Sequence, residues 1–133
     1  AALLPQNYYV DAQEPITLTD SEPEPDVVII RGNRRDYSER HPGPADVGLV
    51  IEVSDSTLKR DQTAKKKVYA AAKIPIYWII NLVDNRIEMY SKPGQVDKQA
   101  DYLQQIDYHF NDSVDVYLDD NKIGRLKLAD ILA

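Results

Sequence analysis

One residue type and several sequence patterns are absent from this sequence, and each absence removes a class of protein. There is no cysteine, which excludes a disulfide framework and any metal site built on thiolates. No apolar run approaches the length of about 20 residues that a membrane-spanning helix needs, and no signal-peptide pattern opens the chain. We therefore expect a cytoplasmic protein that has no membrane partner.

The common catalytic motifs are missing as well. The sequence contains no G-x-S-x-G turn, no Walker-type phosphate loop and no G-x-G-x-x-G loop. His41 and His109 lack the spacing of metal ligands, and no histidine partner is evident for Ser54 or Ser56. A glycosidase-type pair of carboxylates stays open, although a fold of this size offers little room for a sugar-binding cleft.

The balance of charge is acidic, with a formal net charge of −6. Such a balance disfavours a nonspecific coat on nucleic acid, because that kind of binding is driven by basic surface. Positive charge is nevertheless concentrated in residues 31–40 and residues 59–67. Each run fits either a solvated face or a local basic contact with nucleic acid. Any nucleic-acid partner is therefore expected to be held by local basic contacts only.

A chain of 133 residues fits one domain. The alanine-rich residues 56–73 carry apolar side chains at helical spacing and predict the one sizeable helix. Residues 76–91 predict a hairpin with its turn at Asp84–Asn85. The fold class is therefore α+β (α/β), a single mixed central sheet with one main helix packed on it. The other expected strands are residues 7–13, 15–18, 26–31, 46–54, 101–110 and 113–118, and residues 128–132 are expected to form a closing helical turn.

One acidic residue, Glu52, interrupts the apolar strand "LVIEV". A buried carboxylate without a partner costs several kcal/mol or more, so its presence calls for a partner or a function. If residues 26–31 and 46–54 pair antiparallel, Asp26 becomes the cross-strand neighbour of Glu52. Two close carboxylates repel each other, and a divalent cation such as Mg²⁺ removes the conflict.

The helix supplies a third charge. Asp61, Lys65 and Tyr69 follow one another at intervals of four residues and so share one side of a helix. If that side faces the carboxylates, the Lys65 ammonium reaches them and orients an attacking water or stabilises developing charge. The arginine-rich loop of residues 32–45 lies at the far end of the strand pair, so we do not expect it to touch the reacting groups.

Each of these residues has a simpler interpretation. Glu52 fits a structural salt bridge to Lys65 or Arg60, and Lys65 fits a solvated helix face. Asp26 also fits a turn carboxylate, and Tyr69 fits packing alone. Asp55 and Asp61 are most simply explained as acidic residues at a helix start, where the helix dipole favours them.

Two stretches, "EPEPDVVIIRG" and "HPGPADVGLVIEVSDSTLKRDQTAKKKVYAAAKIPIYWIINLVDNRIEMY", resemble the Uma-two family of restriction endonucleases in the PD-(D/E)XK nuclease superfamily. Pro25-Asp26 matches the first part of the superfamily pattern, and Glu52-Val53-Ser54 matches the second except that Ser54 stands where a lysine is expected. Lys65 on the following helix fits as the displaced lysine. The resemblance implies that Asp26, Glu52 and the Val53 carbonyl hold Mg²⁺ (or Mn²⁺), and that Lys65 serves the attacking water. The reaction it implies is hydrolysis of DNA phosphodiester bonds.

The resemblance runs from about Tyr8 to Leu132, and the chain differs from the family at its start. Relatives begin with a helix and a hairpin, and "AALLPQ" is similar to the tail of such a helix. We therefore expect residues 1–133 to be a single nuclease-like domain that lacks the N-terminal helix and hairpin, and exposed strand edges to favour a homodimer. The alternative is a catalytically inactive module that keeps the fold for homo-oligomerisation or protein binding.

Overall fold

The computed structural model describes residues 4–109 and 111–132. Six strands form one sheet in the order β1-β2-β3-β4-β5-β6, and two more strands, β7 and β8, form a separate sheet. The elements, in chain order, are β1 Tyr8–Asp11, β2 Val27–Arg31, η1 Arg34–Tyr37, η2 Pro44–Asp46, β3 Val47–Ser54, α1 Leu58–Gln62, α2 Ala64–Ala71, β4 Ile76–Asn81, β5 Arg86–Val96, β6 Gln99–His109, β7 Ser113–Leu118, β8 Asn121–Lys127 and α3 Leu128–Leu132.

The central sheet is mixed because one of its pairings is parallel. β3 and β4 run parallel, whereas every other neighbouring pair in the sheet is antiparallel. A parallel pair needs a long crossover connection, and α1 and α2 supply it between β3 and β4. This crossover lays the helical segment across one face of the sheet, beside the ends of β2 and β3.

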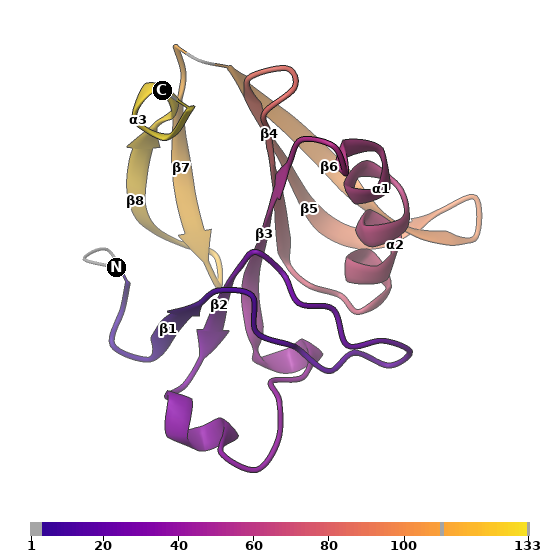
Figure 1. The fold of residues 1–133 in the computed structure, drawn as a ribbon, viewed down its shortest axis with the longest axis vertical. Coiled ribbons are helices and arrows are strands. Elements are labelled where there is room, and N and C mark those ends of the chain that lie inside the picture. Colours follow the sequence, from indigo (N-terminus) through magenta and orange to yellow (C-terminus); the bar gives the residue numbers. More distant parts are fainter. Residues whose placement is uncertain (1–3, 110, 133) are drawn as a thin grey trace.

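The two faces of the sheet are covered by different parts of the chain. Figure 1 shows α1 and α2 on one side of the central strands and the β7–β8 hairpin with α3 on the other. The core on the helical side includes Val28, Val50 and Tyr69, and the core on the hairpin side includes Leu49 and Trp78. Because β3 contributes to both cores, its sequence is an almost continuous apolar run rather than an alternating one.

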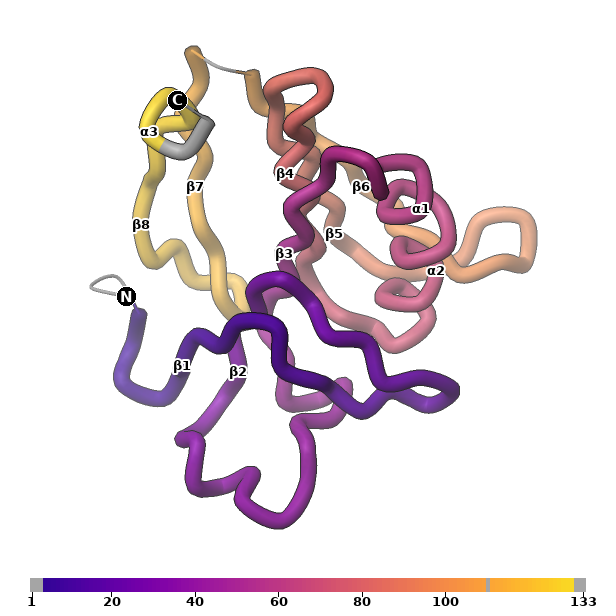
Figure 2. The backbone as a smooth tube through the Cα atoms, viewed as in Figure 1, coloured from indigo at the N-terminus to yellow at the C-terminus, as the bar shows by residue number. Residues whose placement is uncertain are grey.

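The expected fold class is confirmed: the structure is a mixed α+β fold with a main sheet of six strands and one main helix. The expected strand at residues 15–18 is wrong. Ile16 and Leu18 point into the core as a strand would require, but the segment facing them contains Pro23 and Pro25, which have no N–H to donate. Ile16 N–H donates to the carbonyl of Pro23, and the segment stays irregular. Figure 2 shows it extending from β1 towards the side of the molecule that carries the helices.

The helix expected at residues 56–73 is shorter than predicted and is preceded by a separate turn of helix. α2 is the main helix, and α1 is divided from it at Thr63, whose backbone leaves the helical region with φ −121° and ψ −84°. The Thr63 hydroxyl donates to the Lys59 carbonyl at 2.7 Å, a local bond that competes with regular helix. This break could not be predicted from helix propensity, because alanine and lysine nearby favour helix.

The C-terminal part departs from expectation in one further respect. Residues 113–118 form a strand as predicted, but they pair with β8, a strand that was not expected, in a sheet of their own. The turn at Asp84–Asn85 is confirmed, with Asn85 in the left-handed region at φ 52°. Within the described ranges no helix is long and apolar enough to cross a membrane. The expected helix tail spans residues 1–6; residues 4–6 are not helical, and residues 1–3 lie outside those ranges, as does the predicted strand end at residue 110.

Candidate functional site

The pairing of β2 with β3 brings Asp26 beside Glu52. Val27 is the register partner of Ile51, so the residue before Val27 lies next to the residue after Ile51. The Asp26 N–H donates to Glu52 Oε1 at 3.0 Å, and the Val53 N–H donates to Asp26 Oδ2 at 2.7 Å. The structure thus brings together the two carboxylates that the sequence placed side by side.

Two side chains from α2 reach Glu52 from above the sheet. Glu52 is only 1% exposed, and its Oε2 accepts from the Lys65 ammonium at 2.8 Å and from the Tyr69 hydroxyl at 2.8 Å. Lys65 therefore points towards Glu52, on the side of α2 that it shares with Tyr69, and the simpler interpretation of a solvated Lys65 is wrong. The other simpler interpretation, a salt bridge between Glu52 and Lys65, is present in the structure.

Tyr69 serves both packing and the site. Its ring lies 4.9 Å from the ring of Tyr77 in the core, while its hydroxyl donates to Glu52. Burial and the neighbouring Glu52 charge raise the pKa of Tyr69 far above its usual value of 10.0. The hydroxyl is therefore protonated at neutral pH and acts as a fixed donor to the carboxylate.

The Asp61 side chain is buried in the protein, although its simplest interpretation from the sequence was an acidic residue at the start of a helix. It is 2% exposed, and its Oδ2 accepts hydrogen bonds from the hydroxyls of Ser54 and Thr57. Oδ1 is buried and has no hydrogen-bond partner in the described part of the chain, while the Lys65 ammonium lies 3.9 Å away. Ser54, the residue at the position of the lysine in the superfamily pattern, thus holds Asp61.

These side chains surround a cavity of about 300 Å³. Several of the residues around it, Asp55, Ser56 and Arg60 among them, are exposed, so the cavity reaches the surface of the protein. Glu52 is therefore buried among protein atoms and still forms part of a wall that a small ligand can approach. The lining consists of Asp26, Glu52, Val53, Asp55, Ser56, Thr57, Arg60, Asp61 and Lys65.

The oxygen atoms that line this cavity are of the kind that bind a hard cation. Neighbouring residues of a strand send their backbone polar groups to opposite sides; the Ser54 carbonyl accepts from the Leu82 N–H on the β4 side, and the Val53 N–H donates to Asp26 on the other. The Val53 carbonyl therefore faces the edge where Asp26 lies. Two carboxylates, a carbonyl and water are the ligands that Mg²⁺ prefers. Among the residues described, no three histidine or acidic side chains are grouped so that they could hold a metal ion by themselves.

A second buried glutamate, Glu88 on β5, was not predicted from the sequence. It is fully buried, and its two oxygens accept from Gln62, Asn81, Arg86 and Tyr90. Burial raises the pKa of Glu88, but these hydrogen bonds outweigh burial, so its pKa lies below the usual 4.5. The signal was present in "RIEMY", where an acidic residue interrupts an apolar strand just as Glu52 does.

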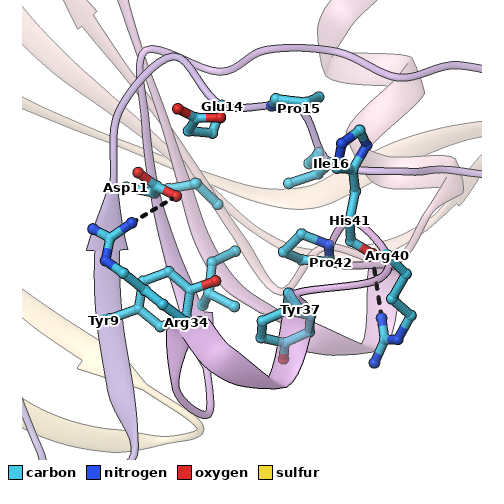
Figure 3. A pocket seen from close by; sticks show the side chains of 12 residues that line it. Tyr9, Asp11, Glu14, Pro15, Ile16, Arg34, Tyr37, Arg40, His41 and Pro42 are labelled. Atoms are coloured by element: carbon cyan, nitrogen blue, oxygen red, sulfur yellow. Dashed lines mark hydrogen bonds and ion pairs between the residues drawn. The ribbon is translucent and has the colours of Figure 1, made fainter.

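The arginine-rich loop borders a different cavity, of about 140 Å³, which is also lined by Val28 and Ile30 of β2. Figure 3 shows Arg34 directed at Asp11, with a distance of 3.2 Å between the charged atoms. Arg34 also covers the ring of Tyr9, and Arg40 pairs with Asp46 at 2.9 Å. The charges of these two arginines are thus balanced by acidic residues beside them.

Comparisons with known proteins agree on the kind of fold. No curated protein matches the chain. A solved structure, described as "a putative nuclease belonging to DUF820 from Anabaena variabilis ATCC 29413", superposes with a TM-score of 0.62. The match covers 96% of this chain and 69% of that one, at 13% sequence identity. A family model named Uma2, with the description "Putative restriction endonuclease", matches residues 1–118. Because that match spans most of the sequence, the chain belongs to the Uma2 family.

Proposed function

We propose that this protein is a metal-dependent endonuclease that hydrolyses DNA phosphodiester bonds at the cavity between the start of β2, the end of β3, α1 and α2. The observation that carries the proposal is the inward Lys65 ammonium, 2.8 Å from a buried carboxylate that lines a surface cavity. Membership of a family with the description "Putative restriction endonuclease" supports the same reaction class. The cell compartment we propose is the cytoplasm, where such an enzyme meets DNA in bacteria.

The residues that would hold the metal are Asp26, Glu52 and the Val53 carbonyl, and the ion would be Mg²⁺ or Mn²⁺. Such an ion stabilises negative charge on the phosphate and lowers the pKa of a bound water. Tyr69 and the Asp26 N–H fix the orientation of the Glu52 carboxylate through their hydrogen bonds. The Val53 N–H does the same for Asp26, so both acidic groups are held in place before substrate arrives.

Lys65 is the residue that we assign to the attacking water. Its ammonium donates directly to Glu52, and its side chain is 26% exposed, so it is in contact with both the carboxylate and the solvent of the cavity. A positive group that reaches the cavity orients a water molecule there and stabilises charge that develops on the phosphate oxygens. A neutral side chain of similar length would lose both effects.

The DNA backbone would be held by local basic contacts. Lys59 and Arg60 on α1 are exposed, and Arg60 lines the cavity. With a net charge of −6, the rest of the surface adds little attraction for phosphates. We therefore expect weak, salt-sensitive binding to DNA in the absence of a metal.

The alternative function is a catalytically inactive nuclease-fold module that self-associates. The observation that favours it is the edge strand β6, which has 11 residues and ends the sheet order. Leu103 on this strand is 58% exposed, and an exposed apolar edge is a template for pairing with a second chain. A homodimer through β6 is compatible with either function.

The deciding experiment is calorimetric titration of Mg²⁺ and Mn²⁺ into the wild type, Asp26→Ala and Glu52→Ala. We expect the wild type to bind and both variants to lose binding, with nicking of a plasmid lost in parallel. Glu39→Ala is the matched control, since Glu39 is an exposed acidic residue outside the cavity, and it should bind as the wild type does. The absence of binding at millimolar metal would reject the enzyme and leave the self-associating module.

A further inference from the structure

We propose that Lys65 has two alternative acceptors, and that its ammonium moves from Glu52 to the unpaired oxygen of Asp61 when a divalent cation binds at Asp26 and Glu52. Asp61 is then a positioning residue that makes room for the cation without touching it. This inference rests on the proposed function, because it concerns how the same cavity accepts its metal.

The first observation is the unpaired oxygen itself. Asp61 Oδ1 is buried and makes no hydrogen bond to any described residue, although a buried polar atom without a partner is costly. The other oxygen, Oδ2, is held by the hydroxyls of Ser54 and Thr57. These two bonds keep the carboxylate from rotating to satisfy Oδ1 elsewhere. The protein therefore maintains a free acceptor in the wall of the cavity.

The second observation is the crowding of Glu52. A carboxylate has about four lone-pair positions, and Glu52 already accepts from the Asp26 N–H, Lys65 and Tyr69. The Asp26 N–H and the Tyr69 hydroxyl are neutral donors and do not oppose a metal. The Lys65 ammonium carries a positive charge, and beside a ligand oxygen it repels any cation that approaches. Metal binding therefore favours a position of Lys65 farther from Glu52.

The third observation is the short distance between the two acceptors. The Lys65 ammonium lies 2.8 Å from Glu52 Oε2 and 3.9 Å from Asp61 Oδ1. A displacement of about 1 Å brings it within hydrogen-bond distance of Asp61, and the flexible four-carbon side chain of lysine accommodates such a step. After the step, Asp61 Oδ1 gains its missing partner and Glu52 has a free position for the metal.

The test is a double-mutant cycle read out as Mg²⁺ affinity by calorimetry. Asp61→Asn keeps one oxygen for Ser54 and Thr57 but places an NH₂ group where Lys65 needs an acceptor. We expect it to weaken Mg²⁺ binding about tenfold when Lys65 is present, which corresponds to a loss of about 1.4 kcal/mol of binding free energy. In the Lys65→Met background, where no ammonium has to move, the same substitution should weaken binding no more than about twofold.

A control separates this role from a general effect of negative charge. Asp55 lines the same cavity but is exposed, so Asp55→Asn removes a charge without removing the acceptor. Its effect on Mg²⁺ affinity should be equal with Lys65 and with Lys65→Met. Equal effects of Asp61→Asn in the two backgrounds would overturn the inference, since Asp61 would then act by its charge alone. Failure of the wild type to bind Mg²⁺ would overturn the proposed function as well.

A second measurement needs no variant and so does not depend on whether Asp61→Asn folds. In a crystal structure of the wild type with Mn²⁺ bound, the Lys65 ammonium should lie within hydrogen-bond distance of Asp61 Oδ1 and no longer contact Glu52. An ammonium that stays on Glu52 beside the bound metal would reject the two-acceptor arrangement while leaving the metal site intact.

Discussion

Glu52 and Glu88 are two buried glutamates in the same row of the central sheet, and they differ in what surrounds their oxygens. Both lie beside Ile79 of β4, Glu52 on one side and Glu88 on the other. Each accepts from a tyrosine hydroxyl and from one cationic side chain. Glu88, however, also accepts from Gln62 and Asn81, whereas Glu52 borders a cavity.

The number of hydrogen-bond partners decides whether a buried carboxylate on a strand serves the stability of the fold or can bind a ligand. The six hydrogen bonds to Glu88 use up its acceptor positions, so a ligand has nothing left to bind. They also connect α1 through Gln62 to β4 and β5, which holds the short helix in place. Glu52 has fewer partners, one of which is a flexible lysine, and it keeps the capacity to bind a cation. Substitution of either glutamate tests this division.

The largest expected effect comes from exchanging each carboxylate for an amide. Glu88→Gln should lower the free energy of unfolding by about 3 kcal/mol, because an amide NH₂ replaces an acceptor among side chains that all donate. Glu52→Gln should lower it less, by about 2 kcal/mol, but should abolish metal binding. Urea unfolding followed by the fluorescence of Trp78, the single tryptophan, measures the first effect, and calorimetry measures the second.

The same pair of variants can also contradict the comparison. If Glu88→Gln kept full stability and lost metal binding, Glu88 would belong to the site. If Glu52→Gln were as destabilised as Glu88→Gln, Glu52 would be a structural residue like its neighbour across β4.

A smaller effect is expected from the two tyrosines. Tyr69→Phe and Tyr90→Phe each remove one hydroxyl that donates to a buried glutamate and leave the ring in the core. Each should cost about 1.5 kcal/mol of unfolding free energy, since the lost bond is to a charged group. Only Tyr69→Phe should also weaken Mg²⁺ affinity, because it alone orients the proposed ligand. An equal loss of affinity in Tyr90→Phe would show that the two clusters are coupled.

The smallest effect concerns pH. Because the pKa of Glu88 is lower in the folded protein than its usual 4.5, its ionisation stabilises the fold above that value and ceases to do so as the pH falls through the folded pKa. The difference in unfolding free energy between wild type and Glu88→Gln should therefore be constant near neutral pH and shrink in acid. The contributions of the other carboxylates to the pH dependence cancel in this difference, because the wild type and the variant share them. A difference that grew as the pH fell would contradict the lowered pKa.

Local patterns in the sequence were sufficient for part of the site and not for the rest. The adjacency of Asp26 and Glu52 followed from strand alternation and an antiparallel pair, and the shared face of Lys65 and Tyr69 followed from helical spacing. The prediction of a strand at residues 15–18 was wrong, because the alternation of apolar residues there reflects burial of Ile16 and Leu18 without a ladder of hydrogen bonds. Glu88 carried the same sequence signal as Glu52, and its different role could not be read from that signal.

The mixed fold and the two acidic positions could be predicted from the sequence, because strand and helix periodicities depend on residues that are neighbours along the chain. Which carboxylate is saturated and which is open could not be predicted in this way. That choice depends on how the crossover between β3 and β4 lays α1 and α2 on the sheet, bringing Gln62 to Glu88 and Lys65 to Glu52. The tertiary structure also decided that Asp61 turns inward with one oxygen unpaired, since Ser54 and Thr57 reach it only after the chain has folded.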